Sequence, residues 1–218
     1  ERKVYVIDQK INDRGVELDM VAVKILKRLA KKETIRLNSE MQAICGLNHT
    51  QTQKLKAWLV LRGVKIASLN KNALARLLAL PTLPKSVRRA LEIRQEAAKS
   101  SVAKLDAMIL RAGPDNRARG CLQMGGALST FRWSGRAVQT QNLPRPVLTP
   151  YMINSILEWI KTCKPEDDME TLETIRMIWG RPMSVFSDCL RGLLISSKGN
   201  VLVGPDLVSI ESLVSAWL

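Results

Sequence analysis

Apolar residues recur every three or four positions along the first half of the chain, which is the spacing of one face of a helix. They predict a long helix that Asp19 caps and Gly46 ends. Its apolar stripe comprises Val21, Ile25, Leu29, Leu37, Met41 and Ile44. Before this helix, residues 4–7 are expected to be extended and residues 12–15 to form a turn.

Three more helices are expected in this half. Thr50 can cap one that runs to Arg62, and Asn70 starts a short one that ends near Leu80. Residues 85–112 form the last and longest, because their apolar positions again follow a single stripe. That stripe comprises Val87, Leu91, Ala98, Val102, Leu105 and Ile109.

The second half mixes short strands with helices, and Gly113-Pro114 separates it from the first. Its expected strands are residues 117–124 and 127–133, paired around Gly125-Gly126, and residues 192–196 and 201–206, paired as a hairpin. Helices are expected over about 150–163 and 168–179, and the last residues begin another. The pattern therefore predicts an α+β, mainly α chain, with a helical domain over residues 1–112 and a second domain over residues 113–218.

Acidic residues gather around the expected helix at 168–179. They are Glu166, Asp167, Asp168, Glu170 and Glu173. Because acidic side chains favour helix N-termini, we interpret this cluster as a solvated cap rather than as a metal site.

The positive charge of the chain is concentrated in its middle. Residues 51–150 contain 18 Lys and Arg against 4 Asp and Glu, whereas residues 1–50 contain 10 against 7 and residues 151–218 contain 6 against 9. A basic segment of this kind is typical of a protein that binds a polyanion. The alternative is a basic, well-solvated surface, and we favour nucleic acid as the partner.

The cysteines and the single histidine suggest no metal framework. Cys45 and His49 could share one helix face as metal ligands, but no second pair accompanies them. Free thiols in a reducing compartment are the better interpretation. The charged start and the lack of a long apolar run favour a cytoplasmic protein with no membrane partner.

Residues 130–145 read TFRWSGRAVQTQNLPR and form a donor-rich loop. Arg132, Arg136 and Arg145 offer forked donors for phosphate. Gln141 and Asn142 can donate and accept at base or sugar edges, and donors in a minor groove test pairing geometry without reading sequence. The alternative is a polar loop that bonds to its own backbone.

This loop resembles the T-G-R-x-S…Q-N-L-P segment of family A DNA polymerases, the bacterial polymerase I group, and is most similar to the phage and prophage branch of that family. Three further segments follow the family's order. Residues 11–19 look like the entry to the thumb, residues 53–63 resemble its Q-L-x-x-W-L-x-x-x-G stretch, and residues 90–104 resemble its long helix. Residues 206–211 align with motif A, D-Y-S-x-I-E, so the likeness covers nearly the whole chain.

The resemblance implies a helical thumb over residues 1–112 and a partial palm over residues 113–218, acting in primer extension by two-metal phosphoryl transfer. Asp206 matches the motif A aspartate, a catalytic residue and Mg²⁺ ligand, and Glu211 matches the catalytic-site glutamate beneath the incoming sugar. The expected partner is double-stranded primer–template DNA. Its candidate contacts are Arg94, Lys99, Lys104, Arg132, Arg136, Gln141, Asn142 and Arg145.

Motifs B and C, which supply the fingers helix and the second aspartate, have no counterpart in these residues, and we expect no exonuclease domain before them. We therefore expect no nucleotide incorporation by this chain alone, and Mg²⁺ binding only if a partner chain or further residues supply a second carboxylate. Phe131, Pro205, Leu207, Val208 and Leu213 depart from the family pattern. The alternatives are a non-catalytic nucleic-acid-binding module derived from a polymerase, and a protein-interaction module.

Overall fold

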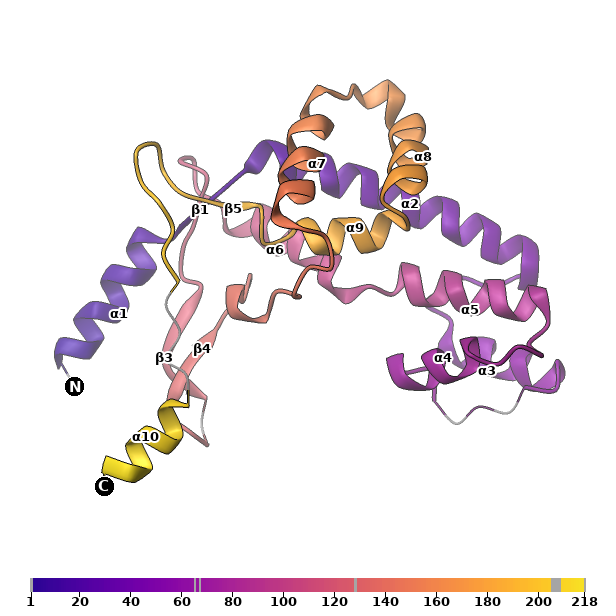
Figure 1. Cartoon of the computed structure of the whole chain (residues 1–218), viewed down its shortest axis with the longest axis horizontal. Helices are drawn as coiled ribbons and strands as arrows, with labels where there is room; N and C mark the ends of the chain where they lie inside the picture. The colour runs from indigo at the N-terminus through magenta and orange to yellow at the C-terminus, as the bar shows by residue number, and fades with distance from the viewer. Residues whose placement is uncertain (1, 65, 67, 128, 205–208, 218) are drawn as a thin grey trace.

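The structure is a computed structural model that describes all residues except 1, 65, 67, 128, 205–208 and 218 (Figure 1). Its α-helices are α1 (Arg2–Arg14), α2 (Met20–Cys45), α3 (Thr52–Leu61), α4 (Lys71–Leu78), α5 (Lys85–Ala97), α6 (Lys104–Arg111), α7 (Pro150–Thr162), α8 (Asp168–Ile178), α9 (Pro182–Cys189) and α10 (Ile210–Trp217). Its strands are β1 (Val16–Leu18), β2 (Arg117–Ala118), β3 (Leu122–Ala127), β4 (Arg132–Gly135) and β5 (Leu194–Ile195). Short 3-10 helices are η1 (Ser100–Ala103), η2 (Thr140–Asn142) and η3 (Pro165–Asp167). Helices dominate and the strands are short and antiparallel, which confirms the α+β, mainly α fold.

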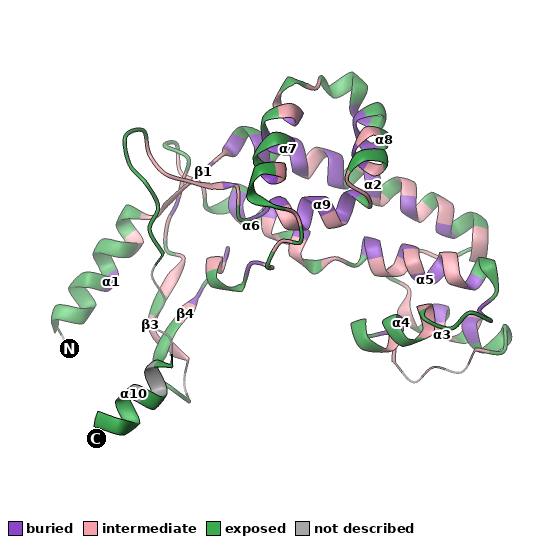
Figure 2. Ribbon diagram, viewed as in Figure 1, coloured by how far each residue is buried: buried purple, intermediate pink, exposed green. Residues whose placement is uncertain are grey.

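Helix α2 is the centre of the molecule, because α5, α6, α7, α8 and α9 all pack against it. Its ends lie where the sequence predicts them. The Asp19 carboxylate accepts a hydrogen bond from the Ala22 N–H at 3.0 Å, and Gly46 ends the helix in the left-handed conformation at φ 71°. Figure 2 shows the buried residues concentrated along α2 and the helices that cover it.

The predicted stripe of α2 is correct except at its first position. Val21 is exposed, and Ala22 and Val23 point inward instead. Residues from both predicted domains, such as Leu29 of α2 and Phe186 of α9, belong to one apolar core. The domain boundary at 112/113 stays a prediction.

The single helix predicted over residues 85–112 is wrong. It is divided into α5, which ends at Ala97, the 3-10 helix η1 over Ser100–Ala103, and α6, which begins at Lys104. Serine competes for backbone hydrogen bonds and is common where helices end, and here the Ser101 hydroxyl donates to the Ser187 hydroxyl of α9 at 2.9 Å. The break changes the phase of the helix, so Ala98 and Ile109 are exposed.

Other helix ends differ by small amounts. Asn70 caps α4 through a hydrogen bond from the Ala73 N–H, as predicted, but α4 ends at Leu78 rather than near Leu80. Thr50 does not cap α3, because the capping position is Gln51 and makes no side-chain bond there.

Residues 4–7 are helical, which corrects the prediction of an extended segment. They belong to α1, which packs against β3. The Asp8 carboxylate accepts a hydrogen bond from the Met124 N–H at 3.2 Å and is buried. This long-range contact overrides the local preference of β-branched residues for strands.

Helices α7 and α8 match their predicted ranges closely, but α9 was not predicted. The acidic cluster is also only partly as interpreted. Asp168 is fully buried and pairs with Arg28 and Lys32 of α2, so it fastens α8 to α2 instead of being a solvated cap.

The strands form two small sheets. In the first, β1 lies between β2 and β5, antiparallel to both. Residues 194–195 therefore pair with β1, and not with residues 201–206 as predicted; the part of that range over 205–206 lies outside the described residues. The second sheet is the β3–β4 hairpin.

The hairpin turns after Ala127 rather than at Gly125-Gly126. Gly125 lies within β3 at φ 60°, where the register between the strands shifts. A glycine with positive φ inside a strand is typical of a bulge.

No described helix combines the length and apolar composition that a membrane span needs.

Candidate nucleic-acid interface

The β3–β4 hairpin sets the positions of the two central arginines. Gln123 of β3 lies opposite Ser134 of β4, and Leu122 lies opposite Gly135. Arg132 begins β4 and Arg136 directly follows it, and both side chains are exposed. The two arginines, which are four positions apart in the sequence, are therefore separated by the length of β4.

Arg136 is held in place by neutral groups. Its Nε donates to Gln123 Oε1 at 2.6 Å, its Nη1 donates to Ser134 Oγ at 3.1 Å, and its backbone N–H donates to the Cys121 carbonyl at 2.7 Å. None of these partners carries charge, so the guanidinium is oriented while its positive charge remains available to an anion.

Two glycines leave room for these side chains. A Cβ on Gly126 would lie 2.6 Å from the Ser134 Cβ and 3.2 Å from Arg136 Nη2. A Cβ on the buried Gly135 would lie 2.1 Å from Gln141 Nε2, so the Gln141 amide rests on the backbone of β4. The glycines permit this close packing of polar groups.

Gln139 joins η2 to α6. It has a left-handed backbone at φ 49°, and its Oε1 accepts hydrogen bonds from Lys104 Nζ at 3.3 Å and from Asn142 Nδ2 at 3.4 Å. Lys104 and Asn142 are thus brought together although 38 positions separate them in the sequence. We call Lys104, Arg132, Arg136, Gln141 and Asn142 the hairpin site.

The other three candidate contacts lie elsewhere. Arg94, Lys99 and Arg145 line a cleft of about 670 Å³ between α4, α5, η1, α9 and the segment 144–147. Burial lowers the pKa of the Arg94 guanidinium and of the Lys99 ammonium. We call this space the cleft. The structure therefore divides the eight predicted contacts between two places.

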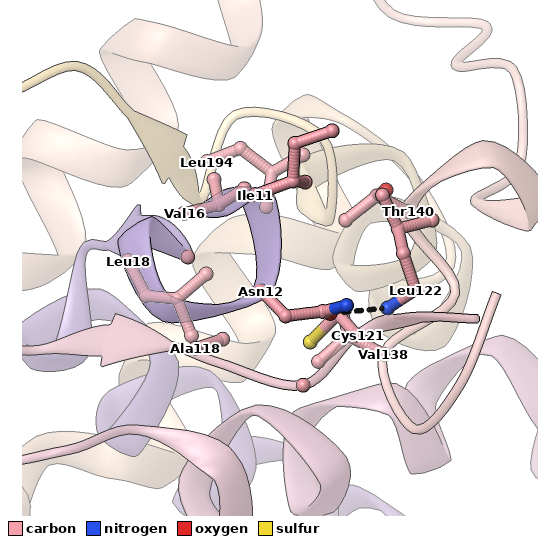
Figure 3. A pocket seen from close by; sticks show the side chains of 12 residues that line it. Ile11, Asn12, Val16, Leu18, Ala118, Cys121, Leu122, Val138, Thr140 and Leu194 are labelled. Carbon is pink, nitrogen blue, oxygen red and sulfur yellow. Dashed lines mark hydrogen bonds between the residues drawn. The ribbon is translucent and has the colours of Figure 1, made fainter. Parts of the chain in front are cut away.

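A smaller cavity of about 50 Å³ lies where α1, β1 and β3 meet (Figure 3). Its lining is mainly apolar, with Ile11, Leu18 and Leu194 among its residues. Asn12 Oδ1 accepts a hydrogen bond from the Leu122 N–H at 3.0 Å there. The small size and apolar lining of this cavity indicate a gap in the packing of α1 against β1 and β3 rather than a ligand site.

The predicted catalytic and metal-binding residue Asp206, and the side chain of the predicted catalytic residue Glu211, lie outside the described residues. Within the part of the chain that is described, no group of three or more His, Cys, Asp or Glu side chains could hold a metal ion. His49 lies beyond the end of α2 and pairs with the side chain of Asn38, at 2.8 Å between His49 Nδ1 and Asn38 Oδ1.

Sequence reasoning missed the residues that support the hairpin site. Gln123, Ser134 and Gln139 hold the predicted donors, and Gly126 and Gly135 make room for them. The turn position controls which residues face each other across the hairpin, so the misplaced turn hid the pairing of Gln123 with Ser134. Gln139 carried no pattern beyond its place in a polar loop.

Comparison with known proteins gives one informative likeness. No protein-family model matches the chain, and no solved structure matches it. Over an alignment of 219 positions that includes the whole chain, it is 38% identical to a DNA polymerase of Bacillus phage SP02. The chain spans 32% of the length of that polymerase. It is therefore similar, from end to end, to about one third of a phage DNA polymerase.

Proposed function

We propose that this chain binds primer–template DNA as part of a family A-like DNA polymerase, with residues 1–112 as thumb and residues 113–218 as partial palm. The observation that carries the proposal is the hairpin site, where exposed Arg132, Arg136, Gln141 and Asn142 lie together with the half-buried Lys104 of α6. Similarity to a phage DNA polymerase over the whole chain supports it.

In this proposal the arginines and the amides have different tasks. Arg132, Arg136 and Lys104 contact phosphate oxygens and fix the register of the duplex. Gln141 and Asn142 donate to minor-groove acceptors, which occupy similar places in all base pairs. Binding would therefore depend on duplex geometry and on charge, with little preference for sequence.

The chemistry of the proposed polymerase would need groups beyond this chain. Asp206 offers carboxylate oxygens, the ligands that Mg²⁺ prefers, and Glu211 would lie beside the incoming sugar. A bound metal pair would polarise the reacting phosphate. The second aspartate and the triphosphate-binding helix would come from further residues or from a second polymerase chain.

DNA binding is tested by fluorescence anisotropy with a labelled primer–template. Arg132→Ala and Arg136→Ala should each weaken binding about tenfold, because each removes a charge-assisted contact. Each should also make the dependence on salt less steep by about one released counterion. Lys164→Ala removes the same charge from an exposed position between α7 and α8 and is the matched control. Equal affinities for all variants, or binding that ignores salt, would contradict the proposal.

The polymerase assignment has a separate test. Primer extension with Mg²⁺ should give no product with this chain alone, and product when a chain carrying motifs B and C is added. Asp206→Ala should abolish that product. If the mixture stays inactive while DNA binding persists, the chain is a non-catalytic binding module.

A protein-interaction role is the second candidate. Helix α1 exposes several large apolar side chains, namely Val4, Tyr5, Val6, Ile7 and Ile11. Exposed apolar patches of this kind mark interaction surfaces. A stable oligomer in sedimentation, without affinity for primer–template, would favour this role.

A further inference from the structure

The cleft is lined by residues with polar atoms that lack hydrogen-bond partners among the described residues, and it lies apart from the hairpin site. Four elements and the segment 144–147 enclose its volume of about 670 Å³. This is within the range of sites that hold one small molecule. A whole duplex, whose major groove alone is about 12 Å wide, cannot enter it.

Positive charge dominates the lining of the cleft. Its cationic residues are Lys71, Arg94, Lys99, Arg145 and Arg181, against the acidic residues Glu96 and Asp188. Asp188 is already engaged, because one carboxylate oxygen accepts the backbone N–H groups of Val147 and Leu148 at 3.0 and 3.2 Å. It holds the segment that carries Arg145. The cleft therefore offers several cations to an anion.

Lys99 is the best placed of these cations. It is half-buried, and its ammonium makes no hydrogen bond or ion pair with any described residue. Burial lowers its pKa, while Asp188 partly opposes the shift. A bound phosphate would supply the negatively charged partner that this ammonium lacks.

Glu96 is the observation that points to more than a simple anion. Its side chain is buried, with 4% of the residue exposed, and its Oε1 has no hydrogen-bond partner among the described residues. The Arg94 Nε is buried without a partner as well. Buried polar groups are nearly always hydrogen-bonded, so each exception requires an explanation.

The electrostatics of Glu96 fit contact with a neutral polar group. Burial, followed by the nearby Glu33, raises the pKa of its carboxyl, while Arg181, Arg36 and Arg89 oppose the shift. Apolar side chains, including Leu69 and Leu74, complete the lining. A ligand that suits the cleft would carry a phosphate, an apolar body and a hydrogen-bond donor on its edge.

We propose that the cleft binds a nucleotide, either free or as one unit of a single strand. The phosphate contacts Lys99 and Arg145, the base packs on the apolar side chains, and an exocyclic amino group donates to Glu96. Acidic side chains accept from the amino group of cytosine in this way. Cytosine should therefore be preferred to thymine, which has no amino group. This site uses none of the residues of the hairpin site and does not depend on duplex binding.

Isothermal titration of the full chain with deoxycytidine monophosphate tests the site. Lys99→Met and Arg145→Ala should each weaken binding about tenfold. Arg136→Ala and Lys164→Ala should leave it unchanged, because both residues lie outside the cleft. Loss of nucleotide binding in Arg136→Ala, or no binding by the unaltered chain, would overturn the proposal of a nucleotide site. Neither result would bear on the separate proposal of duplex binding.

Glu96→Met tests the base contact. It should remove the preference for deoxycytidine over thymidine monophosphate, while the affinity for thymidine monophosphate stays the same. Because an unpaired buried carboxyl is destabilising, the melting temperature without ligand should rise, which also shows that the variant folds. An unchanged preference in this variant would contradict the role of Glu96.

Two further probes identify the source of the nucleotide. A short single-stranded oligodeoxycytidine that binds more tightly than the monophosphate, and loses affinity in Arg145→Ala, supports a unit of a single strand. Equal affinity of the two supports a free nucleotide. Inorganic phosphate that binds as tightly as deoxycytidine monophosphate would overturn the proposal, because the cleft would then recognise only an anion.

Discussion

At Gly135, the hairpin site depends on the absence of a side chain. A Cβ at this position would overlap the Gln141 amide at 2.1 Å, and the amide is the end of a flexible side chain that can move away. Gly135→Ala should therefore leave the fold stable but displace Gln141. We expect primer–template affinity to fall about fivefold, the effect of losing one neutral hydrogen bond.

The control for this change is Gln141→Ala. If Gly135 acts through Gln141, each single variant and the double variant should lose the same affinity. Additive losses in anisotropy measurements would show that Gly135 acts in some other way.

Asp168 should make the stability of the chain depend on pH. Burial alone would raise the pKa of its carboxyl, but hydrogen bonds from Arg28 and Lys32 outweigh burial and lower it. Since the folded state binds this proton less tightly than the unfolded chain does, the stabilisation is complete above the unfolded pKa of about 3.9. It is lost as the pH falls through the lower pKa of the folded state.

Asp168→Asn tests this linkage by urea denaturation at several pH values. It should lower the free energy of unfolding by about 2 kcal/mol near neutral pH, the cost of losing charged hydrogen bonds to a buried group. The difference from the unaltered chain should shrink as the pH falls below the folded-state pKa. A difference that stays constant into strong acid would contradict the ion-pair explanation.

On the scale of elements, Asp19 has two tasks that can be separated. One carboxylate oxygen caps α2, and the other pairs with Lys161 of α7 at 2.7 Å. Asp19→Asn should keep the cap, since Asn caps as well as Asp, and lose the ion pair. Asp19→Ala should lose both, at about 1–2 kcal/mol in urea denaturation. Equal losses in the two variants would mean that the cap contributes nothing.

The elements that could be predicted from sequence are those with local signals at both ends. Helix α2 has a capping Asp19 and a terminal Gly46, so its range follows from neighbouring residues. The break between α5 and α6 has only the weak local signal of Ser100 and Ser101, and apolar periodicity continues through it. Ser101 contacts Ser187 of α9, a helix that was not predicted, and the two serines are 86 positions apart in the sequence. The prediction of an extended segment over residues 4–7 was wrong for the same reason, because the contact of α1 with β3 is long-range.

The candidate site also has a part that could be predicted from the sequence and a part that could not. Residue types and spacing were enough to predict Arg132, Arg136, Gln141 and Asn142 as candidate contacts, because the donors of a polar loop can be read from the sequence, and their role stays a prediction. The separation of Lys99 from Lys104, by contrast, follows from the broken helix. Only the folded chain assigns the first to the cleft and the second to the hairpin site.

For the whole molecule, one core crosses the predicted boundary at 112/113. Helices α7, α8 and α9 pack on α2, and Leu172 and Phe186 belong to the same buried cluster as Leu29. Packing of this kind couples the two parts, so we expect one cooperative unfolding transition rather than two. Two domains with separate cores would instead unfold independently.

The tryptophans allow this to be measured. Trp58 lies on α3, in the first part, whereas Trp159 and Trp179 form a ring pair with centroids 5.5 Å apart in the second. In one variant Trp58→Phe leaves tryptophan fluorescence only in the second part, and in the other the change of Trp133, Trp159, Trp179 and Trp217 to Phe leaves it only in the first. Their urea midpoints should agree with the far-UV circular dichroism midpoint of the same variant. A Trp58 signal that changes at a different urea concentration from the dichroism would show that residues 1–112 unfold as a separate domain.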